Sequence, residues 1–170
     1  MSLSMYQSSV PIFLPLLMNL KAMLEKAAAH CESKKIDPSI LPATRLFPDM
    51  FPLSRQIQIA TDHAKGCPAR LAGIEPPAFD DNEKTLAELI ARVQKTIDYV
   101  NTFKPAQLDG SEERNIELKI GSHELKFIGH VYLLKFALPN FYFHVTTAYN
   151  ILRHNGIEIG KSDYLGHLLR

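Results

Sequence analysis

Apolar side chains that recur every three or four residues in four separate segments are the feature that most constrains this chain. That spacing puts them on one face of a helix, and such a face must be buried against another element. Helices are expected over about 9–32, from Pro52 to about Cys67, from Asp80 to just before Lys104, and from Pro139 to Gly156. Four amphipathic helices of comparable length predict an all-α fold, a four-helix bundle.

Two prolines fall inside the helical patterns. A proline has no N–H for the helix ladder, and its ring clashes with the preceding turn. Pro15 is therefore expected to bend or delay the first helix, and Pro68 to kink or end the second.

Capping signals set the expected limits of the later helices. Asp80, with Glu83 three residues on, predicts a capping box at the start of the third helix. Pro139 suits the first residue of the fourth, and Gly156 a left-handed cap at its end. Ser162 is the expected cap of a short final helix.

A small β-hairpin is predicted just before the last long helix. Segments 116–120 and 125–127 alternate apolar and charged residues, and Gly121-Ser122 separates them. This pattern is typical of two strands joined by a two-residue turn.

The composition favours one soluble domain. The 170 residues, 46% apolar and 22% charged, can bury one core, so residues 1–170 are assigned to a single domain. Residues 1–3, ahead of a second methionine at Met5, have the pattern of an expression scar. The apolar run 10–20 is too short to span a bilayer and contains two prolines, so no membrane association and a cytoplasmic location are expected.

The charge pattern argues against a nucleic-acid partner. Nineteen basic and eighteen acidic residues give a net charge of +1, and the basic residues are scattered along the chain. A protein that binds duplex DNA usually gathers them into a stripe.

The sequence contains few motifs of known chemistry. The segment 156–162 resembles a phosphate-binding loop but has three residues, not four, between its glycines. His63 and Cys67 lie four residues apart and can touch on one helix. A thiolate–imidazole pair there competes with a simpler interpretation of Cys67 as a buried apolar residue.

Histidines supply the best candidate site. No HExxH or HxxxH motif is present, but Asn140, His144 and Thr147 share a face of the fourth helix, and His63 lies at the margin of the second. These four residues form the candidate ligand pocket. They fit a hydrogen-bonded polar seam, a pocket for a non-metal ligand, or a divalent-metal site of His63, His144 and Asn140. A neutral amide is a poor zinc ligand, so no metal or other cofactor is expected.

Aromatic residues surround the fourth helix. Phe141, Tyr142, Phe143 and Tyr149 point in different directions around it, so some must face another helix, the hairpin or a partner chain. Both core packing and a self-association surface fit this pattern.

Two longer segments carry a family resemblance. They are Phe47-Pro-Asp-Met-Phe-Pro-Leu53, continuing through Ala64-Lys-Gly66 to Ala69-Arg-Leu-Ala-Gly73, and Leu138–Gly156 with Gly160-Lys-Ser-Asp-Tyr164. Both resemble an uncharacterised bacterial family of DinB-like proteins, and the similarity covers nearly the whole chain.

The resemblance implies an up-down-down-up four-helix bundle, often dimeric. Many DinB-like proteins hold a divalent metal through one histidine on the second helix and an HxxxH pair on the fourth, and some are thiol-dependent transferases or isomerases. His144 matches the second histidine of that pair, Asn140 stands where the first would be, and His63 lies near the second-helix position.

The leading prediction is a metal-free DinB-like bundle that binds a small ligand or a second copy of itself as a homodimer. The first alternative is a divalent-metal-dependent transferase or isomerase that uses His63 and His144. The second is a structural or protein-interaction module. No catalytic residue is assigned.

Overall fold

The computed structural model describes residues 3–166, so Met1 and Ser2 of the expected scar lie outside it. In chain order the elements are α1 (Val10–Lys34), α2 (Ile40–Ala43), α3 (Leu53–Leu71), α4 (Leu86–Val100), α5 (Pro105–Leu108), β1 (Asn115–Ile120), β2 (His123–Ile128), α6 (Gly129–Val131), the π-helical segment η1 (Tyr132–Ala137), α7 (Leu138–His154) and α8 (Lys161–Leu165). The chain is thus mainly helical with one small sheet, as predicted. Among the helices of residues 3–166, none combines the length and the hydropathy that a membrane span requires.

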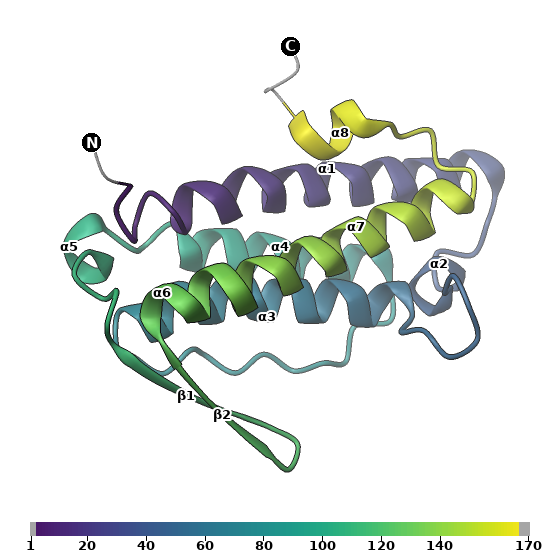
Figure 1. Cartoon of the computed structure of the whole chain (residues 1–170). Coiled ribbons are helices and arrows are strands. Elements are labelled where there is room, and N and C mark those ends of the chain that lie inside the picture. Colours follow the sequence, from purple (N-terminus) through teal and green to yellow (C-terminus); the bar gives the residue numbers. More distant parts are fainter. Residues whose placement is uncertain (1–2, 167–170) are drawn as a thin grey trace.

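Four long helices, α1, α3, α4 and α7, lie side by side in the described part of the chain (Figure 1). Helices α1 and α7 run in one direction, and α3 and α4 run in the other. The main contacts join α3 to α7, α1 to α4, and α3 to α4. One apolar core fills the space between them, and its largest fully buried side chains include Phe13, Phe103, Tyr132 and Phe141. Burial of these apolar stripes is the main force that holds the helices together.

An extended connection, residues 72–85, joins α3 to α4 and runs along the molecule (Figure 1). Arg92 of α4, only 4% exposed, attaches this connection to the helices. Its guanidinium donates to the Thr61 hydroxyl at 2.8 Å and to the Asp80 carbonyl at 2.9 Å. It also pairs with carboxylates of Asp62 at 3.0 Å and Glu83 at 2.9 Å. A buried guanidinium needs such partners, and these bind the connection to α3 and α4.

The predicted cap of α4 is wrong by five residues. Thr85 is the N-cap: its side chain accepts the Glu88 N–H at 3.3 Å, and the Glu88 carboxylate accepts the Thr85 N–H at 2.8 Å. Asp80 and Glu83 lie in the preceding connection, where they bind Arg92 instead. The tertiary contact with Arg92 therefore engages Asp80 and Glu83, which the local pattern assigned to a capping box.

Of the outcomes predicted at the internal prolines, the delayed start at Pro15 and the early end at Pro68 are wrong. Helix α1 begins at Val10 and includes Pro15, and α3 passes through Pro68 and ends at Leu71. A proline removes one bond of the ladder. Beyond Pro68, Ala69 and Leu71 are fully buried, and this burial offsets the lost bond.

The last long helical run begins earlier than predicted, at Gly129 instead of Pro139. A Cβ on Gly129 would lie 1.9 Å from the Ser111 carbonyl oxygen, so the start of this run requires glycine. The run passes through the wider turns of η1 before it reaches Pro139. Its end agrees with the prediction, because Gly156 has the left-handed φ of 86°.

Helix α8 also starts differently from the prediction. Its N-cap is Gly160, whose N–H donates to the Asp163 carboxylate at 2.8 Å, and Ser162 lies inside the helix.

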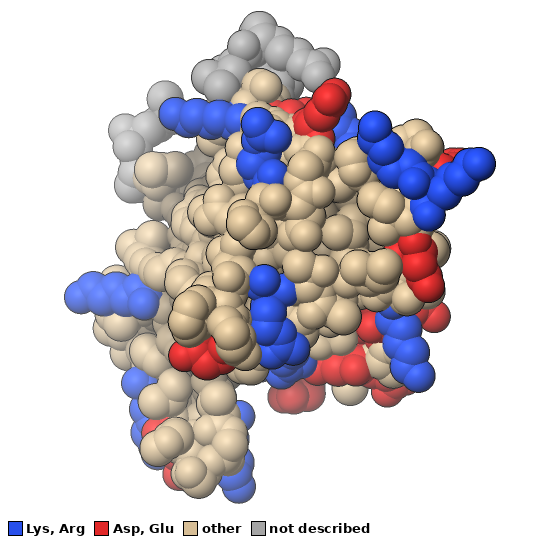
Figure 2. Space-filling view, turned by 90° about the vertical axis from the view of Figure 1, so that its right-hand side faces the viewer, with Lys and Arg blue, Asp and Glu red and all other residues tan. Residues whose placement is uncertain are grey.

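The predicted hairpin is confirmed. Strands β1 and β2 pair antiparallel from Asn115↔Ile128 to Ile120↔His123, and Gly121 adopts a φ of 59° in the turn. The hairpin projects away from the four long helices (Figures 1 and 2). On the face drawn in Figure 2, basic and acidic side chains are interspersed over the surface.

Candidate functional site

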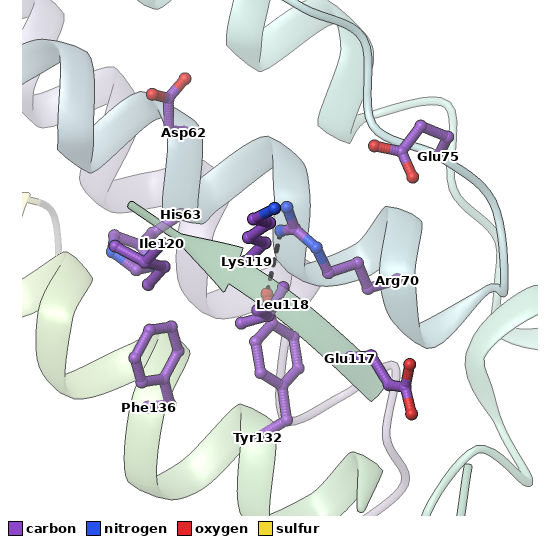
Figure 3. A pocket seen from close by; sticks show the side chains of 10 residues that line it. All are labelled: Asp62, His63, Arg70, Glu75, Glu117, Leu118, Lys119, Ile120, Tyr132 and Phe136. Atoms are coloured by element: carbon purple, nitrogen blue, oxygen red, sulfur yellow. Dashed lines mark hydrogen bonds between the residues drawn. The ribbon is translucent and has the colours of Figure 1, made fainter. Parts of the chain in front are cut away.

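A cleft of about 310 Å³ lies between α3, the extended connection, β1 and η1 (Figure 3). Its lining combines charged, aromatic and aliphatic side chains: Asp62, His63, Arg70, Glu75, Glu117, Leu118, Lys119, Ile120, Tyr132 and Phe136. Small-molecule sites have this character, with an apolar surface and a few polar groups that fix orientation, although this cleft is at the small end of their range.

The π-helical segment shapes one wall of the cleft. Tyr132 and Phe136 lie four residues apart in η1, and their rings stack with centroids 5.9 Å apart. Phe136 also contacts the His63 ring edge-on, at 5.5 Å between centroids. Short π-helical segments occur often at functional sites, and this one presents two aromatic rings to the cleft.

The structure brings His63 and His144 together, as the candidate pocket requires. Their rings are nearly parallel, with centroids 6.3 Å apart and an interplanar angle of 13°. His63 reaches the cleft, whereas His144 lies beside it, 8% exposed, and is not part of the lining.

A buried glutamine orients His144. The Gln56 amide donates to the Phe51 carbonyl at 3.1 Å, so its oxygen is directed toward His144 Nδ1, 2.7 Å away. An amide oxygen only accepts, so Nδ1 carries the hydrogen and Nε2 of neutral His144 keeps its lone pair.

Burial lowers the pKa of both imidazoles to about 4. For His63 the second cause is the neighbouring His144, and the positive charges of Arg70 and Lys65 act in the same direction. For His144 the second cause is Arg55. Both rings are therefore neutral at pH 7, and each offers one N–H donor and one lone pair.

These lowered pKa values predict a loss of stability in acid. In the unfolded chain each imidazole titrates near pH 6.5, so below that pH the unfolded state binds more protons than the folded state. The contribution of neutral His63 and His144 is fully present above pH 6.5 and is lost as the pH falls toward 4. We expect each to account for a decrease of about 2 kcal/mol in the free energy of unfolding between pH 7 and pH 5. Urea denaturation at both pH values should show a smaller decrease for His144→Gln than for the wild type, and equal decreases would contradict the assignment.

The side chains of Asn140 and Thr147 donate hydrogen bonds to backbone carbonyls of their own helical run. The Asn140 amide donates to the Phe136 carbonyl at 2.7 Å, where the chain passes from η1 to α7. The Thr147 hydroxyl donates to the Phe143 carbonyl at 2.7 Å. Neither residue is in the lining of the cleft, and of the four predicted pocket residues only His63 is.

Residues near His63 do not fit the divalent-metal site that the DinB resemblance implies. Within residues 3–166 no group of three or more His, Cys, Asp and Glu side chains is placed to hold a metal ion. His63 and His144 offer two imidazoles, and Asn140 adds only a neutral amide whose nitrogen is bound to Phe136. A stable divalent site of this kind takes three protein ligands.

Cys67 is not a nucleophile in this arrangement. The side chain is fully buried, and burial raises the pKa of the thiol far above its usual range. The predicted alternative of a thiolate paired with His63 is therefore wrong, because burial of the thiol outweighs the opposing effect of the Arg70 charge and keeps it protonated.

Aromatic residues of α7 divide among three environments. Phe141 is fully buried with its ring edge-on to Phe13, and Tyr149 packs against Tyr164. Tyr142 is partly exposed beside α1 and α8, and Phe143 is 59% exposed. Core packing thus explains much of the cluster, and Phe143 is the member left most open to solvent.

Sequence reasoning missed Arg70, Tyr132 and Phe136 as residues of the cleft. Arg70 donates to the Tyr132 hydroxyl at 3.1 Å, across 62 positions of sequence, and no local spacing reveals such a contact (Figure 3). One signal was present: Gly66 interrupts the apolar pattern of α3 four residues before Arg70. A Cβ at Gly66 would lie 2.2 Å from Nη1 of Arg70, so the missing side chain makes room for the guanidinium.

Comparisons with known proteins identify the family. A crystal structure of a DinB family member protein from Shewanella denitrificans is similar to this chain, with a TM-score of 0.84 and 43% identity over 95% of this chain and 91% of that chain. No curated protein matches the sequence. The model of a domain of unknown function, DUF1993, matches residues 5–165. The resemblance seen in the two sequence segments is confirmed, and this chain belongs to the DUF1993 family of DinB-like proteins.

Proposed function

We propose that this protein binds a small organic molecule in the cleft between α3, β1 and η1, on a DinB-like up-down-down-up bundle and without a metal ion. One observation carries the proposal: the cleft joins a neutral, partly buried imidazole, His63, to an arginine, Arg70, that has no acidic partner among residues 3–166. Polar groups that converge beside apolar surface in a cleft are typical of small-molecule sites.

Two kinds of group in the lining of the cleft can contact a ligand. Phe136 and Ile120 offer apolar surface, while His63 and Arg70 offer hydrogen-bond donors. His144, which Gln56 orients, stacks on His63 outside the lining of the cleft, and Asn140 and Thr147 flank His144 on α7. The site contains no activated nucleophile, so binding is the activity that it supports.

A small-molecule screen tests this function. A molecule that binds only the folded state raises the unfolding temperature, and we expect hits whose effect is lost in Phe136→Ala and kept in Phe143→Ala. Both variants remove a phenylalanine from the same helical run, but only Phe136 lines the cleft. Hits that Phe136→Ala leaves unchanged would place the binding elsewhere and contradict the proposal.

Self-association is the second candidate, and the charge pattern of the hairpin favours it. The sheet has two strands within residues 3–166, so the outer edge of β2 has no strand beside it. Glu124 and Lys126 flank Leu125 on β2. If two copies of β2 pair antiparallel about Leu125, each Glu124 faces a Lys126, and opposite charges placed in this way stabilise a pair of strands.

Light scattering over a range of protein concentrations tests this second candidate. We expect a dimer for the wild type and a monomer for Leu125→Lys, because two lysines would then oppose each other at the centre of the paired strands. Leu118→Lys is the matched control, since Leu118 is the cross-strand neighbour of Leu125 and lies on β1. A wild-type monomer, or dimers of equal affinity for both variants, would exclude pairing through β2.

A further inference from the structure

The charged groups of the cleft are not paired with each other. Of its acidic residues, Asp62 pairs with Arg92 at 3.0 Å and with Lys65 at 2.8 Å, and Glu117 pairs with Lys126 at 3.0 Å. All three basic partners lie outside the lining. Two of the three acids of the cleft are therefore engaged outside it, and the third, Glu75, has no ion pair within residues 3–166.

The basic groups of the cleft lack such partners. Within residues 3–166 the Arg70 guanidinium donates only to the neutral Tyr132 hydroxyl, and the Lys119 ammonium has no hydrogen bond or ion pair. In Figure 3 both side chains extend toward the same part of the cleft, away from Glu75. Two cations in one cleft repel each other, and an anion bound between them offsets that repulsion.

The fold holds the Arg70 guanidinium in place. Gly66 leaves room for it against α3, and Tyr132, which is fully buried, accepts its hydrogen bond. An arginine held in this way loses little conformational entropy when an anion binds, and its planar fork suits a carboxylate.

His63 lies close enough to Arg70 to feel its charge. After burial and His144, the charges of Arg70 and Lys65 also disfavour protonation of this imidazole. A neutral imidazole can still donate one N–H to an anion. His63 thus adds a neutral hydrogen-bond donor to the same cleft as Arg70 and Lys119.

We infer that the ligand of this cleft is a small organic carboxylate, whose carboxylate group pairs with Arg70 and Lys119 and accepts from His63. This inference rests on the proposed ligand-binding function and names the ligand class. The rest of the ligand lies against Phe136 and Ile120, so it is compact and at least partly apolar. The volume of about 310 Å³ limits it to a small molecule.

Nuclear magnetic resonance titrations with simple probes test the inference. Phenylacetate and acetate are expected to shift the Arg70 Nε–H resonance and those of His63 in a saturable way, whereas phenylacetamide at equal ionic strength is expected to bind at least tenfold more weakly. Arg70→Gln should abolish the shifts at His63. Arg153→Gln, which removes an exposed arginine of α7, should leave them unchanged.

Gly66→Ala separates the position of Arg70 from its charge. The new Cβ would displace the guanidinium, which is the flexible end of a side chain, while alanine suits a helix better than glycine. We expect a folded protein with the same net charge that binds phenylacetate at least tenfold more weakly. Unchanged binding would show that Arg70 does not hold the carboxylate at this position.

The probe results separate the inference from the proposed function. If phenylacetamide binds this cleft as tightly as phenylacetate, the ligand-binding function stands and carboxylate recognition is overturned. If neither acetate nor phenylacetate shifts the cleft resonances, carboxylate recognition is likewise overturned, and the small-molecule screen with Phe136→Ala judges the function separately.

Discussion

Replacement of Arg92 by methionine is expected to lower the free energy of unfolding by about 3 kcal/mol. Methionine keeps much of the apolar stem but leaves the carboxylates of Asp62, Asp81 and Glu83 without the guanidinium that they share. Glu83 is the most buried of these carboxylates, at 10% exposed, and its desolvation is the hardest to offset. Chemical denaturation measures the effect.

Arg55→Met is the matched control for this prediction. Arg55 also pairs with Asp81, but its side chain is 39% exposed, and exposed ion pairs contribute about 1 kcal/mol or less. In the Arg92→Met variant, limited proteolysis is expected to cut the 72–85 connection faster, because Arg92 attaches it to the helices. Equal losses of stability in the two variants would show that burial of Arg92 is not the source of the effect.

Replacement of Phe141 by alanine is expected to lower the free energy of unfolding by about 4 kcal/mol. Phe141 is fully buried, and its ring meets Phe13 of α1 edge-on with centroids 4.9 Å apart. The substitution removes the contact between the two helices and leaves a cavity that the close-packed core fills only in part.

Phe143 gives the control two residues along the same helix. It is 59% exposed, so Phe143→Ala is expected to change the free energy of unfolding by no more than about 0.5 kcal/mol. Similar effects at the two positions, measured by denaturation under the same conditions, would contradict an orientation of α7 that buries Phe141 and exposes Phe143.

Much of the fold could be predicted because its signals are local. The apolar spacing that defines α1, α3, α4 and α7 follows from helix geometry, and the turn at Gly121 follows from the φ that it requires. The observed helix limits differ from the predicted ones where a tertiary contact engages the residues that form the local signal. Asp80 and Glu83 have the sequence pattern of a capping box but bind Arg92, and Pro68 has the pattern of a helix end but is followed by fully buried residues.

Only part of the candidate site could be predicted. His63 and His144 were singled out because each lies at the margin of an apolar stripe, and the structure places their rings together. Gln56, which orients His144, lies 88 positions away in sequence, and Arg70 meets Tyr132 across 62 positions. Helical periodicity relates residues a few positions apart and carries no information about such pairs.

By itself, the sequence determined the four long helices, the hairpin and the resemblance to the family, because each depends on neighbouring residues or on motifs read directly from the chain. The tertiary structure alone decided which polar side chains meet. It paired Arg92 with the extended connection, placed Gln56 beside His144, and left Arg70 in a cleft without an ion pair to any acid of residues 3–166. The physical reason is that burial of apolar stripes fixes how the helices pack, whereas the partners of the polar groups are chosen only once that packing brings distant segments together.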